Sequence, residues 1–332
     1  MPVKNRFAEL LPDITAWRRD FHENPELLYD THRTAGIVAQ KLREFGCDEV
    51  VEGIGRTGVV GVIRGRTNGS GKVIGLRADM DALPIFEATG AAHASKTPGK
   101  MHACGHDGHT AMLLGAAQYL AETRNFDGTA IVIFQPAEEG GAGGKAMCDD
   151  GLMTRWGIQE VYGMHNMPGL PLGQFAIREG AFFAATDTFT IHVEGKGGHA
   201  AKPQETVDTT VVAAQLVTAL QTVASRNHDP VKNLVVSVTS FRTESEAFNV
   251  IPQHVELRGT VRTMDAETRA MAEVRIKALC AGIAAGFGAT AGVTYVKGYP
   301  VMVNSPEQTE FAAKVAAKVS GGCAPAPLVM GG

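Results

Sequence analysis

The sequence lacks any apolar run close to the ~20 residues that a membrane-spanning helix needs, and its first residues, MPVKNRFAELLPD, lack the apolar stretch of a signal peptide. It also lacks an excess of positive charge, because it contains 31 Lys and Arg residues and 35 Asp and Glu residues. These absences argue against membrane insertion and against nucleic-acid binding. Cysteine is scarce too: five scattered residues argue against a disulfide framework. We therefore expect a cytoplasmic protein with reduced thiols.

A chain of 332 residues, 44% of them hydrophobic, is long enough for two domains. Short apolar segments, from VVGVI at 59–63 to VYGMHN at 161–166, alternate with helical segments. This alternation predicts an α/β domain with a largely parallel sheet and flanking helices, over 1–183 and 298–332. From 184 to 297 the order becomes strand, helix, strand, strand, helix, strand, which predicts an inserted α+β domain.

The segment MHACGHDGHT, from position 101, concentrates metal-binding side chains. Cys104 and His106 lie two residues apart, which places both on one face of an extended loop. A thiolate and an imidazole suit zinc and similar divalent metals. A lone pair of this kind is more often structural, so its neighbours decide the interpretation.

Two further loops carry candidate ligands. Glu138 and Glu139 follow the apolar strand IVIF, and adjacent residues at a strand end point in opposite directions. One carboxylate is then able to bind metal while the other takes a proton from water; the alternative is a solvated acidic pair at a helix N-terminus. His165, in GMHNMPG, follows another apolar run. Since all these loops leave strands or enter helices of one α/β domain, we expect them to converge on a metal site at one sheet edge.

Other residues are weaker candidates. Asp79 and Asp81 close a strand at the same edge, where a carboxylate can orient an imidazole or simply form a turn. His102 and His109 flank the Cys104 motif, and we assign them no role.

Together, the motifs resemble those of the N-acyl-amino-acid amidohydrolases, a family that includes hippurate hydrolases and belongs to the two-metal, zinc-exopeptidase-like enzymes. The resemblance covers nearly the whole chain and rests on RRDFHENPEL, GLRADMDALPI, MHACGHDGHTAMLLGAA, FQPAEEGGAGGKAM, GMHNMPGLPLG, GKGGHAAKP and FNVIPQHVELRGTVRT. It implies an enzyme that hydrolyses the amide bond of a small-molecule N-acyl amino acid. It also implies a divalent metal cofactor (Zn, Mn, Co or Ni), with two ions per subunit in a complete enzyme. The metal ligands that it implies are Cys104, His106, Glu139 and His165, with Glu138 as general base and Asp81 as a further catalytic candidate.

The resemblance also implies that the inserted domain is a lid through which the enzyme forms a homodimer. His199, in GKGGHAAKP, and Asn249, in FNVIP, are then expected to bind the carbonyl or carboxylate of the substrate. Arg262 is a further candidate for binding the carboxylate.

The sequence departs from the family at its C-terminus. Family members continue past MGG and supply one more metal-binding histidine, whereas this sequence ends at Gly332. Two four-coordinate ions that share a water need about six further bonds from the protein. The four implied ligands supply that number only if the thiolate bridges the ions and the carboxylate binds twice. We therefore expect a fragment of a longer enzyme, with an incomplete site.

Three alternatives remain open at this point. One is a carboxypeptidase or dipeptidase on the same scaffold, which a panel of substrates would distinguish. Another is a non-catalytic binding protein built from a truncated enzyme fold, against which the presence of Glu138 argues. The third is a hydrolase with Cys104 as nucleophile, which would stay active in the presence of a chelator.

Overall fold

The computed structural model describes residues 3–327 and divides the chain into two compact units, Met1–Gly169 and Leu170–Gly332. Residues 328–332, where we expect the family's motif to continue beyond this sequence, lie outside the described part of the chain, so that expectation remains a prediction. Residues 170–183 and 298–327 group with the second unit, so their predicted place in the metal-binding domain stays a prediction. Within residues 3–327, no helix is long and apolar enough to cross a membrane.

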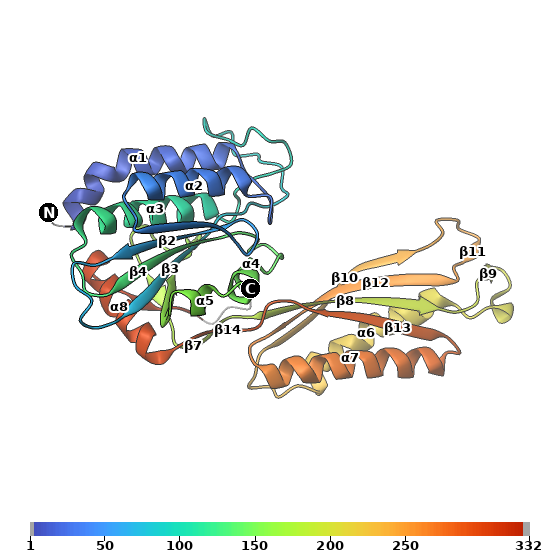
Figure 1. Cartoon of the computed structure of the whole chain (residues 1–332). Helices are drawn as coiled ribbons and strands as arrows, with labels where there is room; N and C mark the ends of the chain where they lie inside the picture. Colours follow the sequence, from blue (N-terminus) through green and yellow to red (C-terminus); the bar gives the residue numbers. More distant parts are fainter. Residues whose placement is uncertain (1–2, 328–332) are drawn as a thin grey trace. The chain divides into compact units, whose positions relative to one another are not determined.

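The first unit is built on a mixed sheet with strand order β1-β2-β4-β3-β5 (Figure 1). Its strands are Glu49–Ile54 (β1), Gly58–Arg64 (β2), Val73–Asp79 (β3), Thr129–Gln135 (β4) and Glu160–Gly163 (β5). Strand β3 pairs in parallel with β4 and β5, whereas β2 pairs antiparallel with β1 and β4. The predicted α/β class is confirmed, and the carboxyl ends of β3, β4 and β5 share one edge of the sheet.

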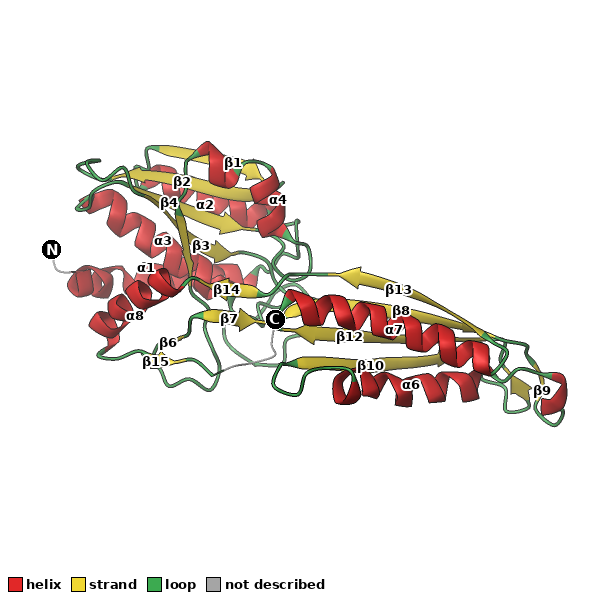
Figure 2. Cartoon of the chain, turned by 90° about the horizontal axis from the view of Figure 1, so that it is seen from below, coloured by secondary structure: helices red, strands yellow, loops and turns green. Residues whose placement is uncertain are grey.

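Helices cover both faces of this sheet (Figures 1 and 2). The helices α1 (Val3–Glu23), α2 (His32–Glu44) and α3 (His106–Thr123) lie on one face, and α4 (Gly143–Asp149) and α5 (Leu152–Arg155) lie on the other. Every residue of β2 except Arg64 is buried. A strand covered on both faces is apolar throughout rather than alternating, which is why the sequence revealed β2 and β4 as continuous apolar runs.

The second unit contains an antiparallel sheet with strand order β10-β12-β8-β13 and two long helices on one of its faces (Figure 2). In chain order these elements are β8 (Ala185–Glu194), α6 (Thr209–Arg226), β10 (Leu234–Thr243), β12 (His254–Thr263), α7 (Ala266–Gly286) and β13 (Thr290–Lys297). Buried and exposed side chains alternate along β8, as in a sheet with one covered face. The side chains of Asp208 and Asp265 accept backbone N–H groups at the starts of α6 and α7, which fixes where both helices begin. This is the predicted α+β order.

Short elements complete the second unit. Strand β9 (Gly198–His199) pairs with β11 (Val250–Ile251), β7 (Gly180–Phe183) with β14 (Met302–Asn304), and β6 (Ala176–Ile177) with β15 (Ala324–Pro325). A 3-10 turn spans Pro203–Glu205, and helix α8 spans Pro306–Ser320.

Candidate metal centre

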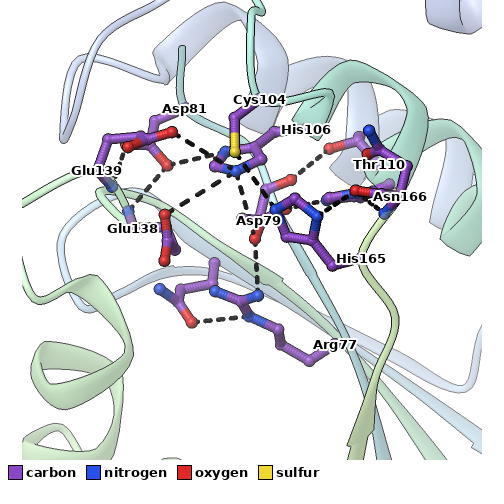
Figure 3. A network of polar contacts seen from close by, with 12 residues as sticks. Arg77, Asp79, Asp81, Cys104, His106, Thr110, Glu138, Glu139, His165 and Asn166 are labelled. Atoms are coloured by element: carbon purple, nitrogen blue, oxygen red, sulfur yellow. Dashed lines mark hydrogen bonds and ion pairs between the residues drawn. The ribbon is translucent and has the colours of Figure 1, made fainter. Parts of the chain in front are cut away.

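The predicted ligands of the first unit come together where β3, β4 and β5 end (Figure 3). Asp79 is the last residue of β3, and the loops after β4 and β5 carry the glutamate pair and His165. Helix α3 begins at His106 beside these loops. Among residues 3–327, ligand atoms within 4.8 Å of one another form three groups, all drawn from the first unit: Cys104, His106 and His165; Asp79, His106 and His109; His106, Glu138 and Glu139.

His106 lies at the centre of this cluster and is fully buried. Its Nδ1 atom is 3.6 Å from Oδ1 of Asp81, and its Nε2 atom is 3.9 Å from a carboxylate oxygen of both Glu138 and Glu139. Both ring nitrogens of His106 and Oε1 of Glu139 are buried and have no hydrogen-bond partner among residues 3–327. Buried polar atoms are normally paired, so this arrangement fits an ion between the imidazole and the carboxylates.

Sequence analysis predicted that the two glutamates point in opposite directions, as adjacent residues at a strand end do. In the structure they do not. Strand β4 ends at Gln135, and Ala137 adopts a left-handed φ of 51° in the turn that follows. Asp81 then accepts the backbone N–H groups of Glu138 and Glu139, at 2.8 and 3.0 Å. The turn therefore directs both carboxylates at Nε2 of His106, and Asp81 holds the backbone of the pair as well as facing the imidazole.

Cys104 and His165 form the other side of the cluster. The Sγ atom of Cys104 is 3.3 Å from Nε2 of His165, and Nδ1 of His165 donates to the backbone carbonyl of Asn166 at 2.6 Å. This local hydrogen bond leaves Nε2 with its lone pair facing the thiol. Gly105 has a φ of 88°, a left-handed conformation that favours glycine, and it turns the chain from Cys104 into α3.

The electrostatics of the cluster favour a cation. Burial raises the pKa of Glu138, and the charges of Asp79 and Glu139 raise it further; burial also raises the pKa of Glu139. Burial alone would lower the pKa of His106, but Asp81, Cys104 and Asp79 outweigh it and raise that pKa to about 11. In the metal-free protein, a proton on His106 thus partly balances an excess of negative charge. Sulfur, nitrogen and oxygen donors around that excess fit divalent metal ions.

Sequence analysis assigned no role to His109, which the structure places in the second of the three groups. Its Nδ1 atom is 2.6 Å from Oδ1 of Asp79, and its Nε2 atom accepts the backbone N–H of Asn166 at 3.1 Å. Both ring nitrogens are therefore occupied by protein partners. Of the three groups, the two that contain Cys104 or the glutamates are the better candidates for metal ligands.

The second unit carries the remaining predicted residues. His199 pairs with Val250 across β9 and β11, and the N–H of Ala200 donates to the carbonyl of Asn249 at 3.0 Å, so His199 and Asn249 are close together. Arg262 lies near the other end of β12, where it pairs with Thr186. It is eight residues beyond His254, or roughly 26 Å at about 3.3 Å per residue. The second unit does not bring Arg262 together with the other two residues.

The chain is similar to known proteins. Residues 75–332 match the peptidase family M20/M25/M40. The hippurate hydrolase of Campylobacter jejuni is 46% identical over 92% of this chain and 78% of that protein, and thermostable carboxypeptidase 2 of Saccharolobus solfataricus is 42% identical over 96% of this chain and 81% of that protein. The crystal structure of the Bacillus subtilis YXEP protein, described as a dinuclear metal-binding peptidase of the M20 family, has a TM-score of 0.81 at 36% identity and covers 97% of this chain and 83% of that one. The chain therefore belongs to the peptidase family M20/M25/M40.

Proposed function

We propose that this chain is a metal-dependent amidohydrolase that cleaves the amide bond of N-acyl amino acids of the hippurate or N-acetyl type. Its family and its 46% identity to a hippurate hydrolase support an enzyme acting on amide C–N bonds. The observation that carries the proposal is the glutamate pair, whose two carboxylates Asp81 directs at His106. One carboxylate is then available as a ligand and the other as a base.

We assign the metal ligands as Cys104, His106, Glu139 and His165. His106 contributes Nε2, because its Nδ1 faces Asp81, and His165 contributes Nε2, because its Nδ1 donates to the backbone. This mixed donor set suits Zn, Mn, Co and Ni. We propose that these residues would hold divalent ions, two per subunit, on the likeness to a dinuclear peptidase.

The chain's own residues account for the movement of protons. A divalent ion held by these residues would supply Lewis acidity for the acyl carbonyl and for the attacking water. The carboxylate of Glu138 takes a proton from the attacking water and returns it to the nitrogen of the leaving amine. Burial and the neighbouring carboxylates raise the pKa of Glu138, which suits a group that must accept a proton and release it again. Asp81 keeps the base in place through the backbone N–H of Glu138.

The test compares Glu138→Gln with Glu139→Gln. Loss of a general base lowers kcat by roughly 10²- to 10⁴-fold. We expect Glu138→Gln to show this loss on hippurate and N-acetyl amino acids with an unchanged metal content by elemental analysis. Glu139→Gln is expected to lose metal as well as activity. If Glu138→Gln loses metal instead, Glu138 is a ligand and not the base; activity that survives chelation would point to a Cys104 nucleophile.

A carboxypeptidase on the same scaffold is the second candidate, because a thermostable carboxypeptidase is 42% identical to the chain. The two candidates differ in the group on the acyl side of the cleaved bond. Relative kcat/KM values on hippurate, N-acetyl amino acids and a set of dipeptides distinguish them. Faster turnover of the dipeptides would favour the carboxypeptidase.

We also propose that His199 and Asn249 bind the substrate. They are neighbours at one end of the second unit, where an imidazole and an amide offer donors for a carbonyl or carboxylate oxygen. Arg262 lies apart from them, so we propose a separate contact for its guanidinium with the substrate carboxylate. Substitution of any of the three by alanine should raise KM at unchanged metal content.

We propose that the chain forms a homodimer through the second unit, with one face of α6 in the interface. The exposed residues on this stripe of the helix are uncharged: Val211, Ala214, Gln215, Thr218 and Gln221. Depletion of charge marks the centre of protein interfaces. In light scattering, we expect a dimer for the wild type, a monomer for Ala214→Glu, and a dimer for the control Ala270→Glu on the exposed side of α7. A monomeric wild type would contradict the proposal.

We further propose a cytoplasmic location, because a thiolate ligand at Cys104 requires a compartment that keeps cysteine reduced. Immunodetection after cell fractionation tests this.

A further inference from the structure

The backbone of Asn166 connects two histidines of the first unit. Its N–H donates to Nε2 of His109 at 3.1 Å, and its carbonyl accepts Nδ1–H of His165 at 2.6 Å. Figure 3 shows Asn166 beside His165, which turns its other ring nitrogen toward Cys104. Any force that holds the N–H of Asn166 therefore also fixes the acceptor that orients the imidazole of His165.

The tautomer of His109 follows from these contacts. A backbone N–H can only donate, so Nε2 of His109 must carry a lone pair and Nδ1 must carry the proton. That proton points at Oδ1 of Asp79, 2.6 Å away. Both residues are buried, with exposed fractions of 3% for His109 and 1% for Asp79. The imidazole of His109 is thus a neutral link between a carboxylate and the backbone of the His165 loop.

Asp79 is itself held firmly. Its Oδ2 accepts from Arg77 at 2.7 Å, and its backbone carbonyl accepts the hydroxyl of Thr110 at 2.9 Å. Arg77 in turn donates to Gln135, the last residue of β4, at 2.9 Å. The link to Asn166 therefore starts from two strands of the central sheet.

The loop that carries His165 depends on such anchors, because residues 164–168 are all exposed and little packing holds them. A second contact lies on its other side: a Cβ atom placed on Gly105 would come within 2.4 Å of the side-chain oxygen of Asn166. The side chain of Asn166 therefore lies directly over the turn between Cys104 and His106. One residue, Asn166, sets the position of the loop against both the sheet and the Cys104 turn.

We infer that Asp79 and His109 are a positioning pair that orients His165 through the backbone of Asn166. The inference rests on the proposed role of His165 as a metal ligand. Groups that orient a ligand from behind typically account for 10- to 100-fold in metal affinity. His109 contributes by accepting a hydrogen bond, and neither of its nitrogens needs to touch the metal.

Two substitutions at His109 separate its two contacts. Glutamine is long enough to place an acceptor oxygen near the position of Nε2, so His109→Gln keeps the bond from Asn166. Asparagine is shorter: it keeps a donor near the position of Nδ1, for Asp79, but does not reach Asn166. We expect metal affinity to fall roughly 10- to 100-fold in His109→Asn and to stay within about 3-fold of wild type in His109→Gln. The measurement is competition for zinc with a chelator of known affinity.

Two controls make the outcomes distinct. Val38→Ala destabilises the same unit by leaving a cavity in its core, far in sequence from the ligands, and should leave zinc affinity unchanged. His165→Ala removes the assigned ligand and must weaken zinc binding at least as much as His109→Asn. Unchanged affinity in His165→Ala would refute the ligand assignment. Weaker binding in His165→Ala but not in His109→Asn would overturn the positioning pair alone, as would equal losses in His109→Gln and His109→Asn.

A further readout requires no metal. Nitrogen-correlated NMR of the metal-free protein reports which ring nitrogen of His109 carries the proton. We expect the proton on Nδ1, protected from exchange by Asp79. A proton on Nε2 would remove the acceptor for Asn166 and overturn the inference.

Discussion

Asp81→Asn tests how the glutamate pair is held. The carboxylate of Asp81 is 1% exposed, and its two oxygens accept one backbone N–H each, from Glu138 and Glu139. An asparagine offers a single acceptor oxygen and directs its NH₂ group at the other backbone N–H. One of the two hydrogen bonds is then replaced by a contact between two donors, and the other loses its charge.

The magnitude follows from these two bonds. A hydrogen bond to a charged group contributes about 1.5–3 kcal/mol, and one between neutral groups contributes about 1 kcal/mol. The contribution of the two hydrogen bonds at Asp81 to stability thus falls from about 3–6 kcal/mol to about 1 kcal/mol. We expect a loss of roughly 3 kcal/mol in the free energy of unfolding. For a domain of this size, each kcal/mol lowers Tm by about 2–4 °C, so we expect a decrease of about 6–12 °C. Because the backbone that carries Glu139 is released, zinc affinity should also fall, by about 10- to 100-fold.

Urea titration and chelator competition measure the two effects on the same preparation. Asp127→Asn is the matched control, because Asp127 also accepts two backbone N–H groups, from Gly69 at 2.8 Å and Ser70 at 2.7 Å, but in an exposed loop. Water can replace its contacts, so we expect a smaller loss of stability and no change in zinc affinity. A loss below about 1 kcal/mol in Asp81→Asn, with zinc affinity unchanged, would refute the reasoning.

Three further predictions concern other parts of the chain. Arg269→Ala leaves the carboxylate of Asp187, 2% exposed, without its ion pair and should destabilise the second unit by about 3–5 kcal/mol in urea; a loss below 1 kcal/mol would show that the pair is dispensable. Gly105→Ala should weaken zinc binding, because its methyl group would displace the side chain of Asn166, whereas Gly46→Ala has a similar φ of 80° and open space around it, so it should bind zinc normally. Metal binding at pH 8 should release a proton from His106, whose pKa in the metal-free protein is about 11, against about 6.5 when unfolded. The stability that this proton contributes is complete below about pH 6.5 and is lost as the pH rises toward about 11. Calorimetry of metal binding in buffers of different ionisation enthalpy would detect release of the proton. A binding enthalpy that does not depend on the buffer would contradict the prediction.

The fold was predictable where burial imposes a pattern on the sequence. Strand β2 is covered on both faces, and its apolar run identified it. Strand β1 was not predicted, because its residues EVVEGI include glutamates at exposed or partly exposed positions and form neither a continuous apolar run nor a clear alternation. Predictions from residue pattern depend on burial, and β1 lies at the edge of the sheet.

The orientation of the glutamates was not predictable, because it depends on the backbone and not on the pattern. Alternation along a strand holds only while the strand continues, and β4 ends before the pair. A left-handed φ at Ala137, a residue that rarely adopts it, was not visible in the sequence. In the structure, Asp81 stabilises this turn by accepting the backbone N–H groups of Glu138 and Glu139. The residue pattern alone does not predict in which direction the two carboxylates point.

The role of His109 depends on where α3 begins. Sequence analysis placed Cys104 and His106 in an extended loop and His109 beside that motif, with no role in the site. In the structure the helix begins at His106, after the left-handed turn at Gly105. Residues three apart on a helix lie on the same face, so the first turn of α3 presents His106 and His109 to the same carboxylate, Asp79, at 3.6 and 2.6 Å. A single helical turn thus carries both a proposed ligand and the residue that we propose orients the loop of another, so the start of α3 matters to the proposed site as much as the identity of its histidines.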